Sequence, residues 1–288
     1  MSNYVIMTDT GSDMLPETLA AWGVSYANLT YRFEGEEVDH TNEDIPSKEF
    51  YNMMRNGKVA KTSAANTASF VDLFEPVLQA GNDILYIAFS SGLSTTCNAA
   101  RLAADQLAES YPDRKIVVVD SLCASAGQGL LVYLAVEKKN TGASLEEVAQ
   151  YTEDVKYKIA HWFTVDDLVY LKRGGRVSPA TAVVGNLLGI KPVLHVDNEG
   201  HLVKVTTARG RKASLAALVD KMIETADDLE GGVIYICNGD CEEDVETLKG
   251  IIRDKCGNEV DMVVPTGTVI GAHSGPGTMA LFFVGSHR

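Results

Sequence analysis

Along the first half of the chain, continuous apolar runs alternate with segments in which apolar residues recur with helical periodicity. Residues 4–9, 83–89 and 115–120 are nearly continuous apolar runs of strand length, and segments with helical periodicity follow the last two. Runs of this kind are typical of strands buried on both faces of a parallel sheet that helices cover. The first half therefore predicts an α/β unit built on a parallel sheet.

Shorter signals predict the connections of this first half. They indicate a helix over 15–23, two strands around the turn at 34–37, a polar loop over 61–66 and a helix that ends at Gly81. Asn66 or Thr67 is expected to cap the last of these helices. Ser144 and Glu147 have capping-box spacing, which predicts the start of the helix that ends this half.

The pattern changes after about residue 160. The second half predicts strands over 161–165, 232–239 and 259–264, helices over 166–175, 178–189, 212–229 and 242–256, and a hairpin over 191–209 around the turn DNEG. A glycine-rich loop then leads into a terminal strand. We therefore expect an N-terminal parallel-sheet α/β lobe over 1–158 and a C-terminal mixed α/β lobe with a hairpin over 159–288. Clefts commonly form where two such lobes meet.

Charge narrows the possible partners. The formal net charge is −14 and the isoelectric point is about 4.8, which argues against nucleic acid or a membrane surface as the partner of the whole molecule. The window 172–212 differs, because its eight basic and two acidic residues give it a charge of +6. This basic window is either a docking site for an anionic partner or a set of solvated loop charges.

The cysteines and the N-terminus indicate a compartment. The N-terminal segment has neither the basic start nor the apolar core of a secretory signal, and no apolar run has the length of a membrane span. The five cysteines are scattered, and the spacing of Cys237 and Cys241 fits neither a zinc ribbon nor a redox pair. We expect idle thiols, no metal and a cytoplasmic protein.

The stretch FSSGLSTTCNAA, residues 89–100, places hydroxyl groups between an apolar strand and a helix, and three chemistries are open to such residues. One is a nucleophile. The nearest match to a G-x-S-x-G elbow is CASAG, in which Ser125 follows a strand and Cys123 replaces the first glycine. A base would have to be one of the histidines downstream, which are His161, His195, His201 and His273. A serine at a helix start is also a common cap.

The other two chemistries concern anions. SSGLSTT lacks the glycines and the lysine of a P-loop, so a nucleotide site has no support. A site that binds an anion without reacting with it is better supported, because Ser94 and Thr95 would add hydroxyl donors at a helix N-terminus. Thr62 and Ser63 would converge with them at the carboxyl edge of the sheet. Alternatively, these residues only cap their own helices.

A set of motifs in order along the whole chain resembles the DegV family. The motifs are TDTGSDM, KTSAAN, SSGLSTTCNAA, VVVDSLCASAGQG, FTVDDLVYLKRGGRVS, LLGIKPVLHVDNEGHLV and IGAHSGPGTMALFFVG. This family comprises bacterial fatty-acid-binding proteins, including the acyl-carrying subunit of fatty acid kinase. The resemblance implies two α/β lobes that bury a long acyl chain, such as palmitate, with no cofactor besides this ligand.

The resemblance also implies roles for residues at the matching positions. Thr62 and Ser94 would hold the carboxylate, with Ser63 and Thr95 as helpers. His273, in the glycine-rich loop GAHSGPG, would lie close to the same group. Of the basic window, Arg176 and Arg209 would face the kinase subunit and the acyl phosphate that it forms, and transient membrane contact is compatible with this role.

Two departures from the family pattern concern the hydroxyl loops. The family often has T-S-x-P-S where this chain has Ala65 and Asn66 at the last two places. It also often has L-S-G-T-Y where this chain has LSTTC, with Thr95 in place of the glycine and followed by Thr96. Both changes are expected to alter loop geometry. The sequence thus favours a fatty-acid carrier without catalysis of its own. A serine hydrolase or acyltransferase that uses Ser125 or Ser94 with His273 remains the alternative, and a sensor of another amphiphile is a third.

Overall fold

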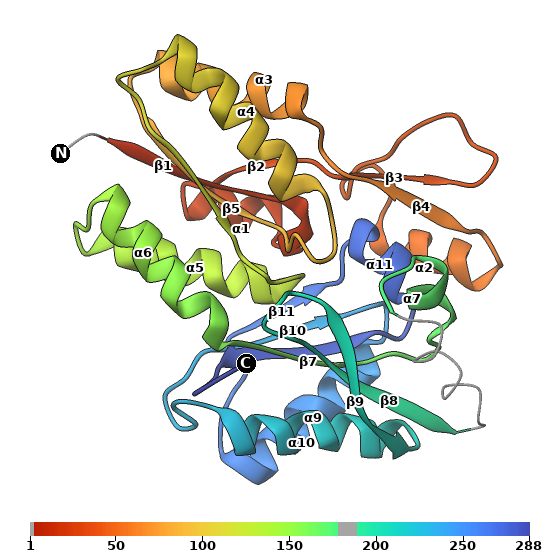
Figure 1. The fold of residues 1–288 in the computed structure, drawn as a ribbon. Coiled ribbons are helices and arrows are strands. Elements are labelled where there is room, and N and C mark those ends of the chain that lie inside the picture. The colour runs from red at the N-terminus through yellow and green to blue at the C-terminus, as the bar shows by residue number, and fades with distance from the viewer. Residues whose placement is uncertain (1–2, 178–188) are drawn as a thin grey trace.

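The computed structural model describes residues 3–177 and 189–288, which form two large β-sheets and one small one with helices around them (Figure 1). The N-terminal sheet has the strand order β2-β1-β5-β6, and all its strands are parallel. These strands are β1 (Tyr4–Asp9), β2 (Ser25–Ala27), β5 (Asp83–Ala88) and β6 (Ile116–Asp120). The parallel sheet predicted for the first half is confirmed.

Helices cover both faces of the N-terminal sheet. On one face, α3 (Thr67–Gln79) and α4 (Thr96–Ser110) pack against β5 through apolar side chains that include Phe70, Phe74 and Tyr86. On the other face lie α1 (Pro16–Ala21), α5 (Ala126–Asn140) and α6 (Leu145–Val155). Ser144 and Glu147 form the predicted capping box of α6.

The C-terminal sheet has six strands in the order β11-β10-β12-β7-β8-β9. They are β7 (Ile159–Thr164), β8 (Ile190–Val196), β9 (Leu202–Arg209), β10 (Ile234–Asn238), β11 (Met262–Pro265) and β12 (Met279–Val284). Only β10 and β11 pair in parallel, so the sheet is mixed, as predicted. Helices α9 (Arg211–Thr225) and α10 (Glu242–Cys256) cover its outer face.

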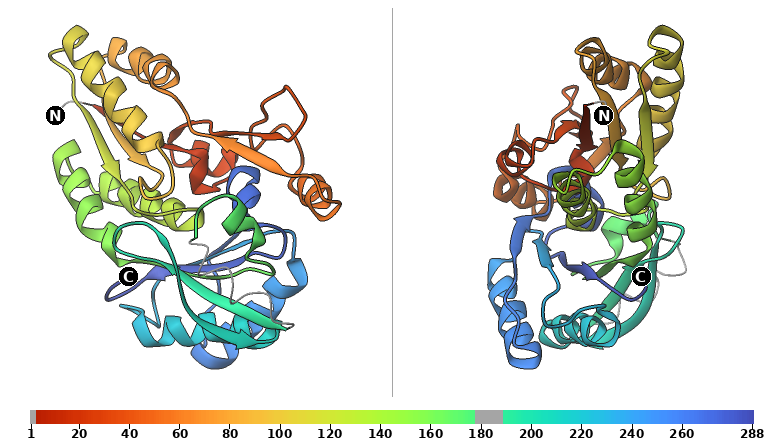
Figure 2. Two further views of the ribbon diagram at one scale, coloured as in Figure 1. Left: turned by 45° about the vertical axis from the view of Figure 1, so that its right-hand side comes forward. Right: turned by 90° about the vertical axis from the view of Figure 1, so that its left-hand side faces the viewer.

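Helix α5 lies between the two sheets (Figure 2). Its apolar residues share one hydrophobic cluster with Leu85 of the first sheet and with Phe163 and Phe282 of the second. The chain crosses from one sheet to the other through the short 3₁₀ helix η2 (Lys156–Lys158). The core is therefore continuous across this crossing, and the division into lobes at residue 158 stays a prediction.

A small two-stranded sheet differs from the prediction. Strand β3 (Thr30–Phe33) pairs antiparallel with β4 (Ala60–Ser63), and across the turn at 34–37 it forms an isolated antiparallel bridge between Tyr31 and His40 instead of pairing with a second strand. Tyr31 and Phe33 are buried against α2 (Ser47–Arg55), whereas the acidic residues after Phe33 stay largely exposed. The polar loop expected over 61–66 is wrong for its first three residues, which belong to β4.

In the second half, one helix matches the sequence prediction and another forms where a loop was predicted. Helix α7 (Val169–Arg173) ends at Gly174, as its sequence predicted. Residues Thr268–Ser274 form the short helix α11 in place of the glycine-rich loop expected there, because Val269 and Ala272 are buried against the β3–β4 sheet and α2. The helix expected over 178–189 lies outside the described residues except for its last position.

The carboxyl edge of the N-terminal sheet is held by the buried carboxylate of Asp9 at the end of β1. It accepts hydrogen bonds from the backbone N–H groups of Gly11 (3.0 Å) and Phe89 (2.9 Å), from the Tyr86 hydroxyl (2.7 Å) and from the Gln128 amide (3.2 Å). Burial raises the pKa of Asp9, and these four donors oppose that shift. The side chain thus fastens β1, β5 and α5 together at this edge.

Replacement of Asp9 by alanine is expected to lower the free energy of unfolding by about 3 kcal/mol or more, because several buried donors lose their acceptor at once. Asp9→Asn keeps one acceptor oxygen and should cost less. Urea unfolding followed by circular dichroism measures both values. Asp72→Ala, at an exposed position of α3, is the control. A loss below about 1 kcal/mol for Asp9→Ala would contradict the anchoring role.

Candidate functional site

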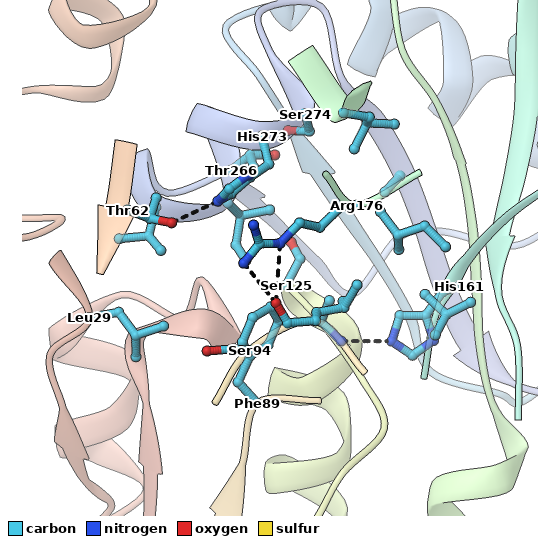
Figure 3. Close-up of a pocket in the computed structure, with 18 of the residues that line it drawn as sticks. Leu29, Thr62, Phe89, Ser94, Ser125, His161, Arg176, Thr266, His273 and Ser274 are labelled. Carbon is cyan, nitrogen blue, oxygen red and sulfur yellow. Dashed lines mark hydrogen bonds between the residues drawn. The ribbon is translucent and has the colours of Figure 1, made fainter. Parts of the chain in front are cut away.

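A cavity of about 480 Å³ lies between the C-terminal sheet and the loops at the carboxyl edge of the N-terminal sheet (Figure 3). Cys237, Ala280 and Phe163 are neighbours across β10, β12 and β7 and form part of its floor. Its volume is within the range of roughly 300–1,000 Å³ typical of small-molecule sites. Arg176 is the one charged side chain among the described residues that line it, if neutral histidines are set aside.

Thr62 and His273 meet at one wall of the cavity, although 211 residues separate them in the sequence. The Thr62 hydroxyl on β4 lies 2.7 Å from Nε2 of His273 on the last turn of α11 and shares a hydrogen bond with it. On the other side of the ring, a Cβ atom at Gly174 would come within 2.1 Å of Nδ1. A glycine in the LKRGGR motif is therefore needed for the histidine to take this position.

Arg176 belongs to the same wall. Its Nε and Nη2 groups donate to the carbonyl oxygen of Leu93 at 3.2 and 2.9 Å, and its Nη1 group donates to the carbonyl of Gly174. Burial lowers the pKa of His273 to about 4, and the charge of Arg176 adds to the effect. The imidazole is thus neutral at pH 7 and lies beside a fixed positive charge.

Ser94 and Thr95 line the cavity from the loop between β5 and α4. The Ser94 hydroxyl lies 2.9 Å from that of Thr96 and accepts the Thr96 N–H at 3.3 Å, so it supports the helix start as well as facing the cavity. Thr95 has φ −80° and ψ 0°, which any residue adopts. A threonine in place of glycine is accommodated there without strain.

The other departure from the family pattern is also accommodated. Asn66 is the N-cap of α3, and its side chain accepts the N–H of Ser69 at 3.0 Å. Ala65 is buried in the cluster between α3 and the sheet. Ser63 lines the mouth of the cavity and is exposed. The loop therefore keeps Thr62 and Ser63 at the cavity despite its different sequence.

Ser125 lies at the cavity but has no histidine partner within the described residues. Its hydroxyl donates to Oδ2 of Asp13 at 2.5 Å and lies 3.1 Å from Sγ of Cys237. Burial raises the pKa of Asp13 to about 7, although the Ser125 hydroxyl favours its ionised form. The nearby His161 uses both nitrogens on the backbone, since it accepts the N–H of Ala124 and donates to the carbonyl of Ile159.

Arg209 lies away from the cavity, as far as the described residues show. It is exposed at the end of β9, where it pairs with Ile190. Part of the basic window is neutralised, because Lys191 contacts Asp166 at 2.7 Å and Arg211 contacts Asp244 at 2.9 Å. Of the two arginines expected to face a kinase, Arg176 turns inward and Arg209 points into solvent.

Sequence reasoning missed three hydroxyl residues of the cavity, Ser274, Thr266 and Thr278. Ser274 Oγ is buried and has no hydrogen-bond partner among the described residues. Its place beside His273 in the HSGPG motif was the available signal. Thr266 precedes α11 and carried no signal, because its exposure to the cavity depends on how α11 packs.

Neither a metal site nor a membrane span is found in the part of the chain that the structure describes. No group of histidine, cysteine, aspartate and glutamate side chains there has the arrangement of a metal site. None of the helices described combines the length and the apolar character needed to cross a bilayer.

Fold and cavity together define an α/β protein that encloses a cavity between its two large sheets. The chain belongs to the DegV family, whose family model, described as "Uncharacterised protein, DegV family", matches residues 3–286. A DegV domain-containing protein of Clostridium perfringens is 40% identical over 289 residues, which cover 100% of this chain and 99% of that protein. The family membership that the sequence motifs suggested is thereby confirmed.

Solved structures show the same fold. A fatty acid (stearic acid)-binding protein from Eubacterium ventriosum has a TM-score of 0.88 and 26% identity, and the match covers 98% of both chains. A fatty-acid-binding DegV family protein from Thermus thermophilus has a TM-score of 0.86 and 29% identity, with 99% of this chain and 100% of that one covered. The predicted fold is confirmed over nearly the whole chain.

His273 makes stability depend on pH. Its pKa is lower in the folded protein than in the unfolded chain, so the unfolded chain binds more protons between about pH 6.5 and 4 and stability falls as the pH falls through that window. Between pH 7.5 and pH 5, His273→Gln should remove about 2 kcal/mol of the loss seen in the wild type. Urea unfolding at both pH values gives the difference. His201→Gln, at an exposed position, is the control.

Proposed function

We propose that this protein binds a long-chain fatty acid, with the carboxylate at Thr62, Ser94 and His273 and the acyl chain buried in the cavity. The observation that carries the proposal is the chemistry of the lining. Hydroxyl groups and one arginine gather at one wall, no carboxylate lies among the described lining residues, and the remainder is largely apolar. A ligand with one negative charge and a long hydrocarbon chain matches this lining.

The energetics favour the same ligand. Burial of about fourteen methylene groups contributes roughly 11 kcal/mol at about 0.8 kcal/mol each. Each hydrogen bond to the charged carboxylate adds about 1.5–3 kcal/mol. The chain therefore supplies most of the affinity, and the hydroxyl groups fix the orientation. A carboxylate without such donors would be costly to bury.

Arg176 gives the proposed carboxylate site a net positive charge, because His273 beside it is neutral. Arg176 is held by the Leu93 carbonyl, so its positive charge stays at the wall where the carboxylate would lie. Ser274 Oγ, buried and without a partner among the described residues, is a further candidate donor. Ser63 and Thr95 would act as helpers at the mouth. The binding of stearic acid by the Eubacterium ventriosum protein supports a long-chain fatty acid as the ligand.

We further propose that the protein is a carrier that presents the fatty acid to a separate kinase. A catalytic serine is not supported, because within the described residues neither Ser94 nor Ser125 has a hydrogen bond to His273. Arg209, exposed at the end of β9, would then contact the kinase. Arg176 would stabilise the negative charge of the phosphoryl group as the carboxylate attacks it and the acyl phosphate forms.

The binding proposal predicts that lipid extracts of the purified protein contain a stoichiometric long-chain fatty acid, detected by mass spectrometry. Thr62→Val combined with Ser94→Ala should weaken binding of palmitate to the delipidated protein at least about tenfold for each hydroxyl removed. Thr206→Val combined with Ser110→Ala removes two exposed hydroxyls as the control. Unchanged palmitate affinity in the first double variant would refute the site. Labelling of the protein by a fluorophosphonate would instead favour the hydrolase alternative.

The carrier proposal predicts acyl phosphate formation only when this protein, ATP and the catalytic subunit of a bacterial fatty acid kinase are all present. Arg209→Ala should lower kcat/KM for the loaded carrier about tenfold or more without changing palmitate affinity, because a charged contact with the partner is lost. Arg253→Ala, an exposed arginine on α10, is the matched control. Equal rates for Arg209→Ala and wild type would exclude Arg209 from the interface.

A further inference from the structure

A second group of polar side chains lies at the other end of α11 from His273. The Thr266 hydroxyl contacts Sγ of Cys237 at 3.3 Å, Cys237 contacts the Ser125 hydroxyl at 3.1 Å, and Ser125 donates to Asp13 at 2.5 Å. We call Thr266, Cys237, Ser125 and Asp13 the inner polar chain. Its first three members line the cavity, although all four are at least nine-tenths buried.

The inner polar chain is separate from the proposed carboxylate site. Thr266 lies just before α11 and His273 lies on its last turn, seven residues later. At 1.5 Å per helical residue, the two positions are roughly 10 Å apart along the helix. Val269 and Ile270, which also line the cavity, lie between them in the sequence. A fatty acid anchored at Thr62 and His273 would reach the inner polar chain near the middle of its hydrocarbon chain.

The hydroxyl hydrogens of the inner polar chain determine which hydrogen bonds it offers to a ligand. Ser125 has one hydroxyl hydrogen and directs it to Asp13, so its oxygen keeps lone pairs for an acceptor role. Thr266 has one hydroxyl hydrogen, which Cys237, a weak acceptor, takes in the absence of a better one. A ligand hydroxyl can donate to the Ser125 oxygen and accept from Thr266. A methylene group in the same place can do neither.

Backbone strain is a second observation at this place. Asp13 has φ +56° and Ser125 has φ +54° with ψ −147°, which are left-handed values that favour glycine. Each costs about 1–3 kcal/mol, and such strain is concentrated at ligand-binding and active sites. Glycine at either position would relieve the strain but would remove the hydrogen bond between the two side chains.

We infer that the cavity prefers fatty acids that carry a hydroxyl group near the middle of the chain over the corresponding unsubstituted acids. This inference rests on the proposed fatty-acid binding and names the substrate class within it. The ligand hydroxyl is bound between Ser125 and Thr266, while the carboxylate occupies the site at the other end of α11. A hydroxyl at the far end of the acyl chain would lie away from both polar groups and would be buried without a partner.

The test measures dissociation constants of delipidated protein for stearic acid, 10-hydroxystearic acid, 12-hydroxystearic acid and ω-hydroxystearic acid at pH 8, where Asp13 is ionised. One or both mid-chain hydroxy acids should bind about three- to tenfold tighter than stearic acid. The ω-hydroxy acid should bind more weakly than stearic acid. If stearic acid binds but neither mid-chain hydroxy acid is preferred, the inference is wrong and the proposed function stands. If no acid binds, both fail.

Variants locate the preference within the inner polar chain. Thr266→Val keeps the shape of the side chain and removes its hydroxyl, and Ser125→Ala removes the acceptor. Either change should abolish the preference for the mid-chain hydroxy acid over stearic acid, so that the ratio of the two dissociation constants falls to about one. Thr278→Val is the matched control, because the Thr278 hydroxyl also belongs to a lining residue but donates to the Gly275 carbonyl. Should Ser125→Ala not fold, Thr266→Val decides alone, and a preference that persists in it overturns the assignment.

Discussion

The packing of both sheets against one helix, α5, is the constraint on which the rest of the structure depends. The sequence AGQGLLVYLAV has little amphipathic character, so a helix with these residues must be covered on more than one side. The N-terminal sheet covers one side through Leu85 and Ile87, and the C-terminal sheet covers another through Phe282. The turn that enters α5 is thereby held between the sheets, and Ala124 and Ser125 of this turn line the cavity.

The sequence predicted the parts of the site that depend on regular sheet topology. Continuous apolar runs identified the parallel strands, and strands of that type place their following loops at one edge, which is why Ser94 was expected near Thr62. The pairing of Thr62 with His273 was not predictable in this way. It depends on β4, whose four residues AKTS carry no strand signal alone and become a strand only because Tyr31 and Phe33 pair with them.

Two further differences have local physical causes. The glycines of GAHSGPG suggested a loop, but a helix forms because Gly271 lets α11 approach Tyr51, whose hydroxyl would lie 2.3 Å from an added Cβ atom. Arg176 was expected to face a partner, yet its guanidinium turns inward to the Leu93 carbonyl. Long charged side chains point wherever an acceptor and burial of the stem favour them, and a sequence does not show where a carbonyl oxygen lies.

Ser125 illustrates how one local geometry serves different chemistries. It follows a strand, precedes a helix and has a positive φ, as the nucleophile of a hydrolase elbow does. A nucleophile also needs a base that takes its proton and an electrophilic carbonyl to attack. Asp13 accepts the hydrogen bond, but within the described residues no imidazole lies beyond it to relay a proton. The carboxylate of a free fatty acid is also a poor electrophile. In the proposed carrier, the same strained serine therefore holds a hydrogen-bond network at the wall of the cavity and leaves the acid unchanged.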